Sequence, residues 1–158
     1  MAEGIEIREA SVADVAFIAG ANAAMALETE RKSLDRATLM SGVAAVFARP
    51  ERGFYLIAQR EGRPAGCLMV TREWSDWRNG EWWWLQSVYV VPEDRRTGVF
   101  RALYRAIEKR ARSGQDVVGL RLYVELENSA AQATYAQLGM QRAQYGMYVR
   151  TFQDDRGA

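Results

Sequence analysis

The spacing of hydrophobic and polar residues changes several times along the chain, and each change predicts a new element. Ile5 and Ile7 alternate with polar residues, which predicts a short first strand. Ser11 and Asp14 have the spacing of a capping box, and apolar residues then recur at helical intervals as far as Met25. A helix is therefore expected directly after the first strand.

The rest of the chain continues to switch between helix and strand patterns. Turn signals lie at Glu61–Pro64 and at Asn79–Gly80, and Gly139 follows the last helical pattern. The further predicted elements are a helix over 34–48, strands over 53–59, 65–71 and 82–91, a helix over 98–112, a strand over 117–124, a helix over 128–138, and a last strand or strand pair over 140–152. This order, βααβββαβαβ, predicts one mixed α/β or α+β domain over residues 1–153, with a frayed tail at 154–158.

Composition narrows the classes of function. The chain has 158 residues, enough for one domain with a proper core, and its formal net charge of +1 gives no broad attraction to nucleic acid or to a membrane surface. The single cysteine, Cys67, fits a reducing compartment. Residues 1–20 lack the pattern of a signal peptide, and no apolar run approaches the roughly 20 residues that cross a bilayer. A cytoplasmic protein with no nucleic-acid or membrane partner is expected.

The chain contains no histidine, and this absence restricts the chemistry. Without histidine and with one cysteine, a zinc site, a Cys-His pair or a Ser-His-Asp triad is excluded, and no metal is expected. The usual general base near neutral pH is also missing. A carboxylate, a tyrosine or a chain of water molecules must therefore move any proton.

The segment from Val88 to Tyr104 has the order strand, basic turn, helix. The β-rich run ends at Pro92, and Gly98 opens an amphipathic helix. Free backbone N–H groups in the turn and the first helical turn point at one spot, where the helix dipole favours negative charge. Arginine side chains surround that spot at Arg95, Arg96 and Arg101. This segment predicts a site for a ligand that carries phosphate.

Two motifs in this order resemble those of the GNAT N-acetyltransferase superfamily. The turn Arg95–Phe100 is similar to its pyrophosphate loop, Gln/Arg-x-x-Gly-x-Gly/Ala, and the segment Asn128–Met140 resembles its second signature, Asn-x-x-Ala-x-x-x-Tyr-x-x-x-Gly-Phe. The element order agrees over nearly the whole chain. The resemblance implies a mixed, mostly antiparallel sheet with helices on both faces, and acetyl-CoA as cosubstrate.

In the family, the pantetheine arm of CoA lies between the strand that holds Val88 and the strand that holds Val124, and pairs with strand backbone. Asn128 would cap its helix and also contact the pantetheine, and Tyr135 would be the general acid that faces the CoA sulfur. Oxyanion stabilisation would come from the N–H of Val88 or its neighbour. The resemblance assigns these residues to acetyl-CoA: Val88, Tyr89, Val90, Arg95, Arg96, Thr97, Gly98, Val99, Phe100, Arg101 and Asn128.

The chain departs from the family pattern at two positions. Phe100 replaces the last small residue of the loop, so its side chain must turn away from the pyrophosphate and pack in the core. Trp84 stands where many members have a catalytic carboxylate, which leaves the general base open. Glu125, directly after the strand beside the CoA slot, is the first choice for the base. The other candidates are Glu28, Glu73 and Asp76.

The acceptor is expected to be a small amine rather than a protein. All five tryptophans lie in 73–84, a hairpin that borders the acceptor side in the family. Acidic and aromatic side chains there can hold a cation, with 23–30 as the opposite wall. The substrate-binding candidates are Glu28, Glu73, Trp74, Asp76, Trp77 and Gln86.

The leading hypothesis is direct transfer of an acetyl group from acetyl-CoA to a primary amine in a ternary complex. Cys67 is interpreted as a core residue and not as an acyl carrier. The alternatives are a non-catalytic module that binds or senses acyl-CoA, a nucleotide-binding domain of another fold, and a structural interaction protein. A homodimer is also considered, with the apolar C-terminal strand as its candidate interface.

Overall fold

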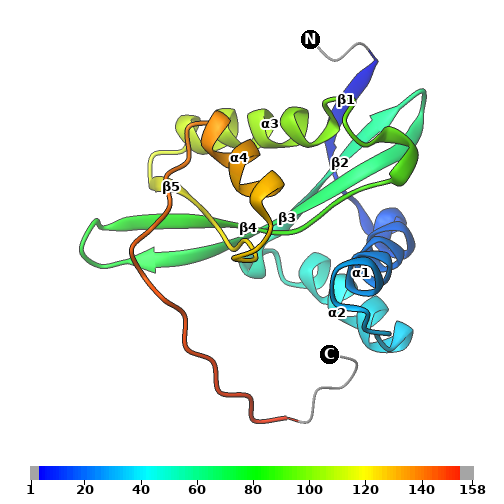
Figure 1. The fold of residues 1–158 in the computed structure, drawn as a ribbon, viewed down its shortest axis with the longest axis horizontal. Coiled ribbons are helices and arrows are strands. Elements are labelled where there is room, and N and C mark those ends of the chain that lie inside the picture. Colours follow the sequence, from blue (N-terminus) through cyan, green and yellow to red (C-terminus); the bar gives the residue numbers. More distant parts are fainter. Residues whose placement is uncertain (1–3, 154–158) are drawn as a thin grey trace.

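The computed structural model describes residues 4–153 and shows a sheet covered by helices on both faces (Figure 1). The predicted frayed tail at 154–158 lies outside the described residues. The elements in chain order are β1 (Ile5–Glu9), the 3-10 helix η1 (Val12–Asp14), α1 (Val15–Glu30), α2 (Arg36–Ala48), η2 (Pro50–Arg52), β2 (Phe54–Arg60), β3 (Arg63–Ser75), β4 (Gly80–Val90), η3 (Pro92–Asp94), α3 (Val99–Ser113), β5 (Val117–Leu122) and α4 (Ser129–Gln137).

The sheet has the order β1-β2-β3-β4-β5, so each strand lies beside its neighbour in sequence. The first three pairings are antiparallel, and only β4 and β5 run parallel, joined by α3 as a crossover helix. The α+β architecture with a mixed, mostly antiparallel sheet is therefore confirmed. Across the sheet, β3 and β4 form its long central hairpin, which projects beyond the helices (Figure 1).

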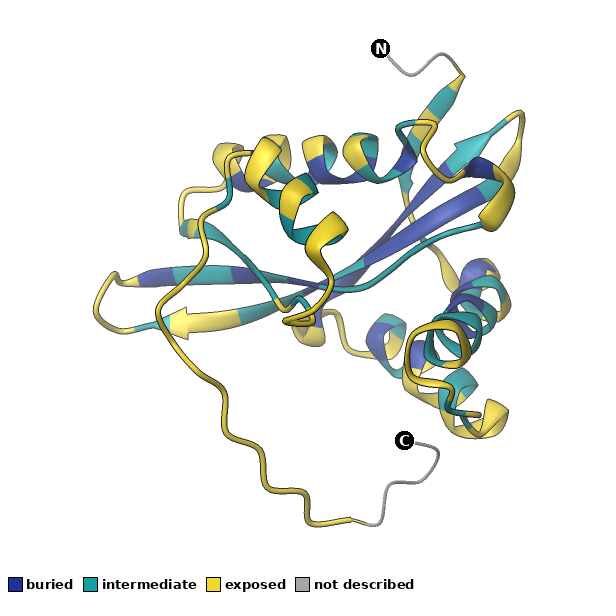
Figure 2. Cartoon of the chain, viewed as in Figure 1, coloured by how far each residue is buried: buried dark blue, intermediate teal, exposed yellow. Residues whose placement is uncertain are grey.

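Two hydrophobic clusters hold the layers together, one on each face of the sheet. Leu103 and Ile107 of α3 are fully buried in the first cluster, against side chains such as Leu68 of β3. Ile18 of α1 and Val43 of α2 belong to the second cluster, on the opposite face. Figure 2 shows the buried stripe of the sheet between these layers. Alternating side chains along each strand feed both clusters, as period-two geometry requires.

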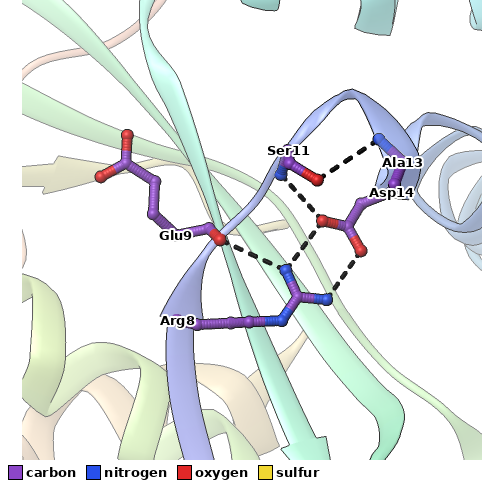
Figure 3. Close-up of polar contacts among 5 residues, drawn as sticks. All are labelled: Arg8, Glu9, Ser11, Ala13 and Asp14. Carbon is purple, nitrogen blue, oxygen red and sulfur yellow. Dashed lines mark hydrogen bonds and ion pairs between the residues drawn. The ribbon is translucent and has the colours of Figure 1, made fainter.

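The start of α1 is fixed by the predicted capping box and by one ion pair (Figure 3). The Ser11 hydroxyl accepts a hydrogen bond from the Ala13 N–H, and the Asp14 carboxylate accepts one from the Ser11 N–H. Arg8 of β1 donates two hydrogen bonds of 2.8 Å to the buried Asp14 carboxylate. These hydrogen bonds from Arg8 lower the pKa of Asp14. The entry of α1 is thereby tied to the first strand.

By length and composition alone, residues Val12–Glu30 could also cross a membrane, although the sequence was expected to hold no such segment. Their contacts are those of a core helix. Ile18, Ala19 and Ala21 are buried against α2 and the sheet, while Glu28 and Glu30 are charged and exposed at the helix end. The packing of α1 into the second cluster therefore accounts for its apolar composition.

The prediction of a last strand or strand pair over 140–152 was wrong. Within residues 4–153 no strand follows α4, and residues 141–153 run as an exposed, extended segment away from the domain (Figures 1 and 2). The composition of this segment is that of a strand, but a strand needs a neighbour for its backbone hydrogen bonds. The sequence pattern identified the conformation that residues 141–153 favour and could not supply the neighbour.

Candidate functional site

The pairing between β4 and β5 stops before β4 ends. The last paired residues are Leu85 and Leu122, where β5 finishes, whereas β4 continues to Val90. Among the described residues, the β4 segment 86–90 therefore has a strand neighbour on its β3 side alone. A gap of this kind beside an exposed strand backbone is what an extended ligand arm needs in order to pair as an additional strand.

The backbone orientation shows which groups of β4 face this open side. The N–H of Val91 donates to the Ala65 carbonyl of β3 at 2.9 Å, so the Val90 carbonyl, on the other side of the same trans peptide, points away from β3. Val88 lies two residues earlier and faces the same way. The backbone groups of Val88 and Val90 that the predicted contact would use therefore face the open side.

A β-bulge interrupts β4 at the point where the pairing with β5 has just ended. Opposite it, Cys67 pairs with Tyr89 and Met69 with Gln86, so Ser87 and Val88 face a single residue of β3. Ser87 has φ of 49°, an unusual value for a non-glycine residue. Its carbonyl lies 3.9 Å from the Cys67 thiol, so the N–H of Val88 points away from Cys67. Strain of this kind concentrates at functional sites.

The turn after β4 presents backbone N–H groups at the start of α3. Arg96 and Gly98 both have positive φ, 62° and 96°. Gly98 is the N-cap of α3 and has no side chain that could cap the helix. The first helical hydrogen bond runs from the Ala102 N–H to the Gly98 carbonyl. The N–H groups of the first turn are therefore left for a ligand, and the helix dipole adds positive potential. The turn therefore has the geometry that the sequence predicted for an anion site, and the binding of an anion there stays a prediction.

Buried Asp94 holds this turn in place, a role that the sequence analysis missed. Its carboxylate accepts hydrogen bonds from Arg60 at 3.1 Å and from Arg63 at 3.0 Å. The Thr97 hydroxyl donates to the Asp94 carbonyl at 2.6 Å. The signal in the sequence was weak, since an acidic residue before two arginines is ordinary on a surface. Arg60 and Arg63 flank the β2–β3 turn, and only the fold brings this turn next to Asp94.

The three predicted arginines of the anion site are exposed, but they differ in their partners. Arg95 donates to the Glu28 carboxylate at 2.7 Å and to the Val90 carbonyl at 3.0 Å, and it also lies over the ring of Tyr89. Among the described residues, Arg96 and Arg101 form no ion pair. Arg95 therefore links α1 to β4, and it occupies the Val90 carbonyl, which faces the open side of β4.

Tyr135 lies on α4 and packs edge-on against Phe100, with ring centroids 5.8 Å apart. Phe100 in turn lies against Tyr104 of the core. The expectation that Phe100 turns into the core is confirmed, and the ring also supports Tyr135. Burial raises the pKa of Tyr135, so its phenol keeps its proton to higher pH than free tyrosine. Asn128 caps α4 through a hydrogen bond from the Ala131 N–H, as expected.

A pocket of about 430 Å³ lies between α1, α2 and the bulge of β4. Its lining combines apolar side chains with Ser87 and the ends of polar side chains of α1. The lining residues are Asn22, Met25, Ala26, Thr29, Glu30, Leu34, Leu39 and Ser87. The Asn22 side-chain oxygen is buried and has no hydrogen-bond partner among the described residues. The sequence pattern gave no sign of this vacant acceptor.

The predicted hairpin residues do not gather at this pocket. Glu73 pairs with Arg121 of β5, and Arg121 stacks on the ring of Trp82. Trp74 alternates with Glu73 and so faces the opposite side of the sheet, and Trp77 is 88% exposed at the hairpin tip. Asp76 lies in the same tip. In the structure these side chains brace the hairpin or face solvent.

The two remaining candidates, Gln86 and Glu125, have distinct surroundings, as does Trp84, which replaces the family's carboxylate. Gln86 donates to the Thr71 hydroxyl, and Trp84 packs on Tyr123 with centroids 4.5 Å apart. Glu125 is exposed on the loop after β5, and its carboxylate has no hydrogen bond or ion pair within residues 4–153. Since Glu28 and Glu73 are each paired with an arginine, Glu125 is the more available carboxylate.

Comparison with known proteins identifies the family of this chain. Residues 21–140 match the family model described as the acetyltransferase (GNAT) family. The structure of a possible acetyltransferase from Clostridium difficile 630 is 43% identical, with a TM-score of 0.89 and coverage of 96% of this chain and 100% of that chain. No curated protein sequence matches the chain.

More distant structures share the fold. A probable acetyltransferase is 20% identical, with a TM-score of 0.83 and coverage of 95% of this chain and 99% of that chain. A predicted acetyltransferase from Clostridium acetobutylicum, whose structure was solved with acetyl-CoA, is 11% identical, with a TM-score of 0.76 and coverage of 92% and 96%.

Proposed function

Because the chain belongs to the acetyltransferase (GNAT) family, we propose that it moves an acetyl group from acetyl-CoA directly to a primary amine in a ternary complex. One observation carries this proposal. The β4–β5 pairing ends at Leu85 and Leu122, β4 continues to Val90 without a neighbour on that side among the described residues, and the turn that follows leaves the first N–H groups of α3 without a side-chain cap. An extended arm that ends in a diphosphate fits this combination of open strand and anion site.

The chain's own groups fit the parts of acetyl-CoA in order. The N–H groups of the first turn of α3, with Arg96 and Arg101, would hold the diphosphate. The backbone of Val88 and Val90 would pair with the pantetheine amides, for which Arg95 must release the Val90 carbonyl. When bound, acetyl-CoA supplies an activated acetyl thioester.

Three groups have the chemistry for the transfer. The Val88 N–H, directed away from β3 by the bulge, would stabilise negative charge on the acetyl oxygen. The Tyr135 phenol, kept protonated by burial, would donate to the departing sulfur. Glu125 would take a proton from the amine, directly or through water.

Cys67 supports direct transfer over an acyl-cysteine. Its side chain, on β3, is fully buried in the second cluster, and burial raises the pKa of its thiol to about 12. A nucleophilic cysteine needs a thiolate near neutral pH and access to the substrate. Cys67 has neither, which supports attack on the thioester by the amine itself.

The pocket below the bulge is the proposed acceptor site. Its volume of about 430 Å³ suits a small molecule. Met25, Leu34 and Leu39 would cover an apolar body, and the vacant Asn22 oxygen would accept a hydrogen bond from a donor such as an amine or a hydroxyl. A small amine with an apolar portion is therefore proposed, rather than a protein.

The test measures binding and turnover separately. Acetyl-CoA should raise the melting temperature of the full chain, and release of free CoA thiol should depend on an added amine from a panel of polyamines, amino acids and aminoglycosides. No thermal shift with acetyl-CoA would contradict the proposal. A shift without thiol release for any amine would favour the alternative, a module that binds acyl-CoA without catalysis.

A further inference from the structure

Lysine side chains are scarce in this chain. Of its 21 lysine and arginine residues, only two are lysines, Lys32 and Lys109. The distinction matters for acetyl transfer, because a lysine amine with a pKa of about 10.4 has a neutral fraction that can attack a thioester, whereas a guanidinium stays charged. Each lysine is therefore a chemically competent acceptor within the protein itself, and the two lie in different places.

Lys32 lies at the rim of the proposed acceptor pocket. It belongs to the segment 31–35, which joins α1 to α2. The Lys32 N–H donates to the Ala26 carbonyl at 3.2 Å, and Ala26 lines the pocket. Glu30 and Leu34, on either side of Lys32 in the sequence, line it as well. The backbone of Lys32 is therefore held between three residues of the lining.

The amine of Lys32 also lies beside the lining. Its nitrogen is 3.5 Å from a carboxylate oxygen of Glu30. The two side chains are 42% and 52% exposed, so the ion pair is weak and the amine can leave it at little cost. The lysine stem is four carbons long and flexible. The amine is therefore held at the pocket by a contact that it can readily exchange for another.

The other end of the pocket is the place proposed for the acetyl group. Ser87 lines the pocket, and the next residue is Val88, whose N–H would stabilise the acetyl oxygen. One pocket of about 430 Å³ therefore connects the surroundings of Lys32 with those of the thioester. We propose that Lys32 is a self-acetylation site, whose amine is the acceptor within the same copy when no other amine occupies the pocket. This inference rests on the proposed transfer from acetyl-CoA.

The reaction balances with acetyl-CoA as the only co-reactant. The neutral Lys32 nitrogen attacks the acetyl carbon, so that a C–N bond forms and the C–S bond breaks. Of the two protons that the lysine ammonium loses, one passes to solvent and the other ends on the CoA sulfur, for which Tyr135 is the proposed donor. The amide product carries no charge. The ion pair is thereby lost, and the Glu30 carboxylate is left at the pocket without this partner.

Lys109 is an internal control for this reaction. It is exposed on α3, and α3 covers the opposite face of the sheet from α1 and α2 (Figure 1). Its acetylation therefore reports the rate at which acetyl-CoA modifies an exposed lysine that lies away from the pocket.

The first test incubates the full chain with acetyl-CoA, without an amine, and maps acetylation by mass spectrometry. Cleavage after arginine releases the two lysines in the peptides 32–36 and 106–110. Lys32 should be acetylated at least about tenfold faster than Lys109, as expected for an amine held at the reacting group. A burst of CoA thiol should accompany it, which Lys109→Arg keeps and Lys32→Arg loses. Equal rates at the two lysines would overturn the proposal, and this comparison needs no variant that might fold differently.

The second test asks whether the modification occurs in the site of the same copy. Excess CoA, which carries no acetyl group, should slow acetylation of Lys32 and leave that of Lys109 unchanged. The acetylated fraction of Lys32 at a given time should not depend on protein concentration. A fraction that rises with concentration would mean that one copy modifies another, and would refute the proposal. Insensitivity of Lys32 to CoA would also refute it.

The inference and the proposed function fail in different ways. Thiol release that requires an added amine, with Lys32 left unmodified, would refute self-acetylation and leave the proposed function intact. Absence of both thiol release and a thermal shift with acetyl-CoA would remove both.

Discussion

The proposed cofactor side and the proposed acceptor side of this molecule are built from different kinds of groups. On the proposed cofactor side, the groups that would contact acetyl-CoA are mostly backbone groups: the open stretch of β4, the positive-φ residues Arg96 and Gly98, and the N–H groups at the start of α3. On the acceptor side, the pocket is made by side chains of α1, α2 and the β4 bulge. The two sides meet at Ser87 and at the ion pair between Arg95 and Glu28.

This difference explains how each side can vary. A site made of backbone needs only a strand end, a glycine turn and a helix, so the surrounding side chains can change, as Phe100 illustrates. A pocket made of side chains changes its preference whenever one of them changes. We therefore expect substitutions on the cofactor side to act through backbone geometry or chemistry, and those on the acceptor side to act through selectivity.

The largest expected effect is on chemistry. Tyr135→Phe removes the proton donor but keeps the ring contact with Phe100, so kcat should fall by about 10²–10³ while the KM for acetyl-CoA changes little. Tyr104→Phe, in the same aromatic row, is the control and should retain activity. Steady-state kinetics with the best amine checks both. Equal loss in the two variants would indicate that packing, and not the phenol, is what matters.

The pH dependence of kcat tests the same role of the Tyr135 phenol. Burial raises the pKa of Tyr135, so the neutral phenol is favoured in the folded protein. The fall of kcat at high pH should therefore begin above the ordinary tyrosine pKa of about 10. That alkaline limb should be absent from the residual activity of Tyr135→Phe. A limb that stays in the variant would assign it to another group.

The next largest effect is expected on acetyl-CoA binding, and it tests whether the proposed anion site is built from backbone groups. Gly98 has φ of 96°, which a β-branched residue adopts only with strain of roughly 1–3 kcal/mol. Gly98→Val should weaken acetyl-CoA binding by about 10- to 100-fold in calorimetry. The control Gly42→Ala lies inside α2 with open space around it, and should bind normally and be slightly more stable. Normal binding by Gly98→Val would contradict a site built from this turn.

The same contrast determines how much could be predicted from sequence. Strand, glycine turn and helix are consecutive along the chain, so the backbone geometry of the proposed anion site at 95–101 and the caps at Ser11 and Asn128 were predicted from local patterns. The pocket at Asn22 and the support of the turn by Asp94 arise from segments far apart in sequence, and no local pattern marks them. The prediction of a strand over 140–152 was wrong for a related reason. The strand character of these residues is visible in the sequence, but whether a neighbouring strand lies beside them is not.

A smaller effect is expected on the KM for the amine, and it tests whether side chains of the proposed acceptor pocket bind the acceptor. Asn22→Leu removes a buried oxygen that has no partner, so the protein should become more stable, by up to about 1 kcal/mol. The KM for the amine should rise by about tenfold, with acetyl-CoA binding unchanged. Thr29→Val is the matched control in the same pocket, because the Thr29 hydroxyl already donates to the Met25 carbonyl. An unchanged amine KM in Asn22→Leu would move the acceptor away from this pocket.

The smallest effect concerns the ion pair that joins the two sides. Arg95 must leave the Val90 carbonyl before that group can pair with pantetheine, and Glu28 holds Arg95 in place. Both side chains are 41% exposed, so the pair contributes at most about 1 kcal/mol. Glu28→Gln should therefore tighten acetyl-CoA binding by about two- to fivefold, whereas the control Glu30→Gln should not. Because salt screens such a pair, the two proteins should converge at high ionic strength. Weaker binding by Glu28→Gln would show instead that Glu28 orients Arg95 for the diphosphate, and that the acceptor side helps to build the cofactor side.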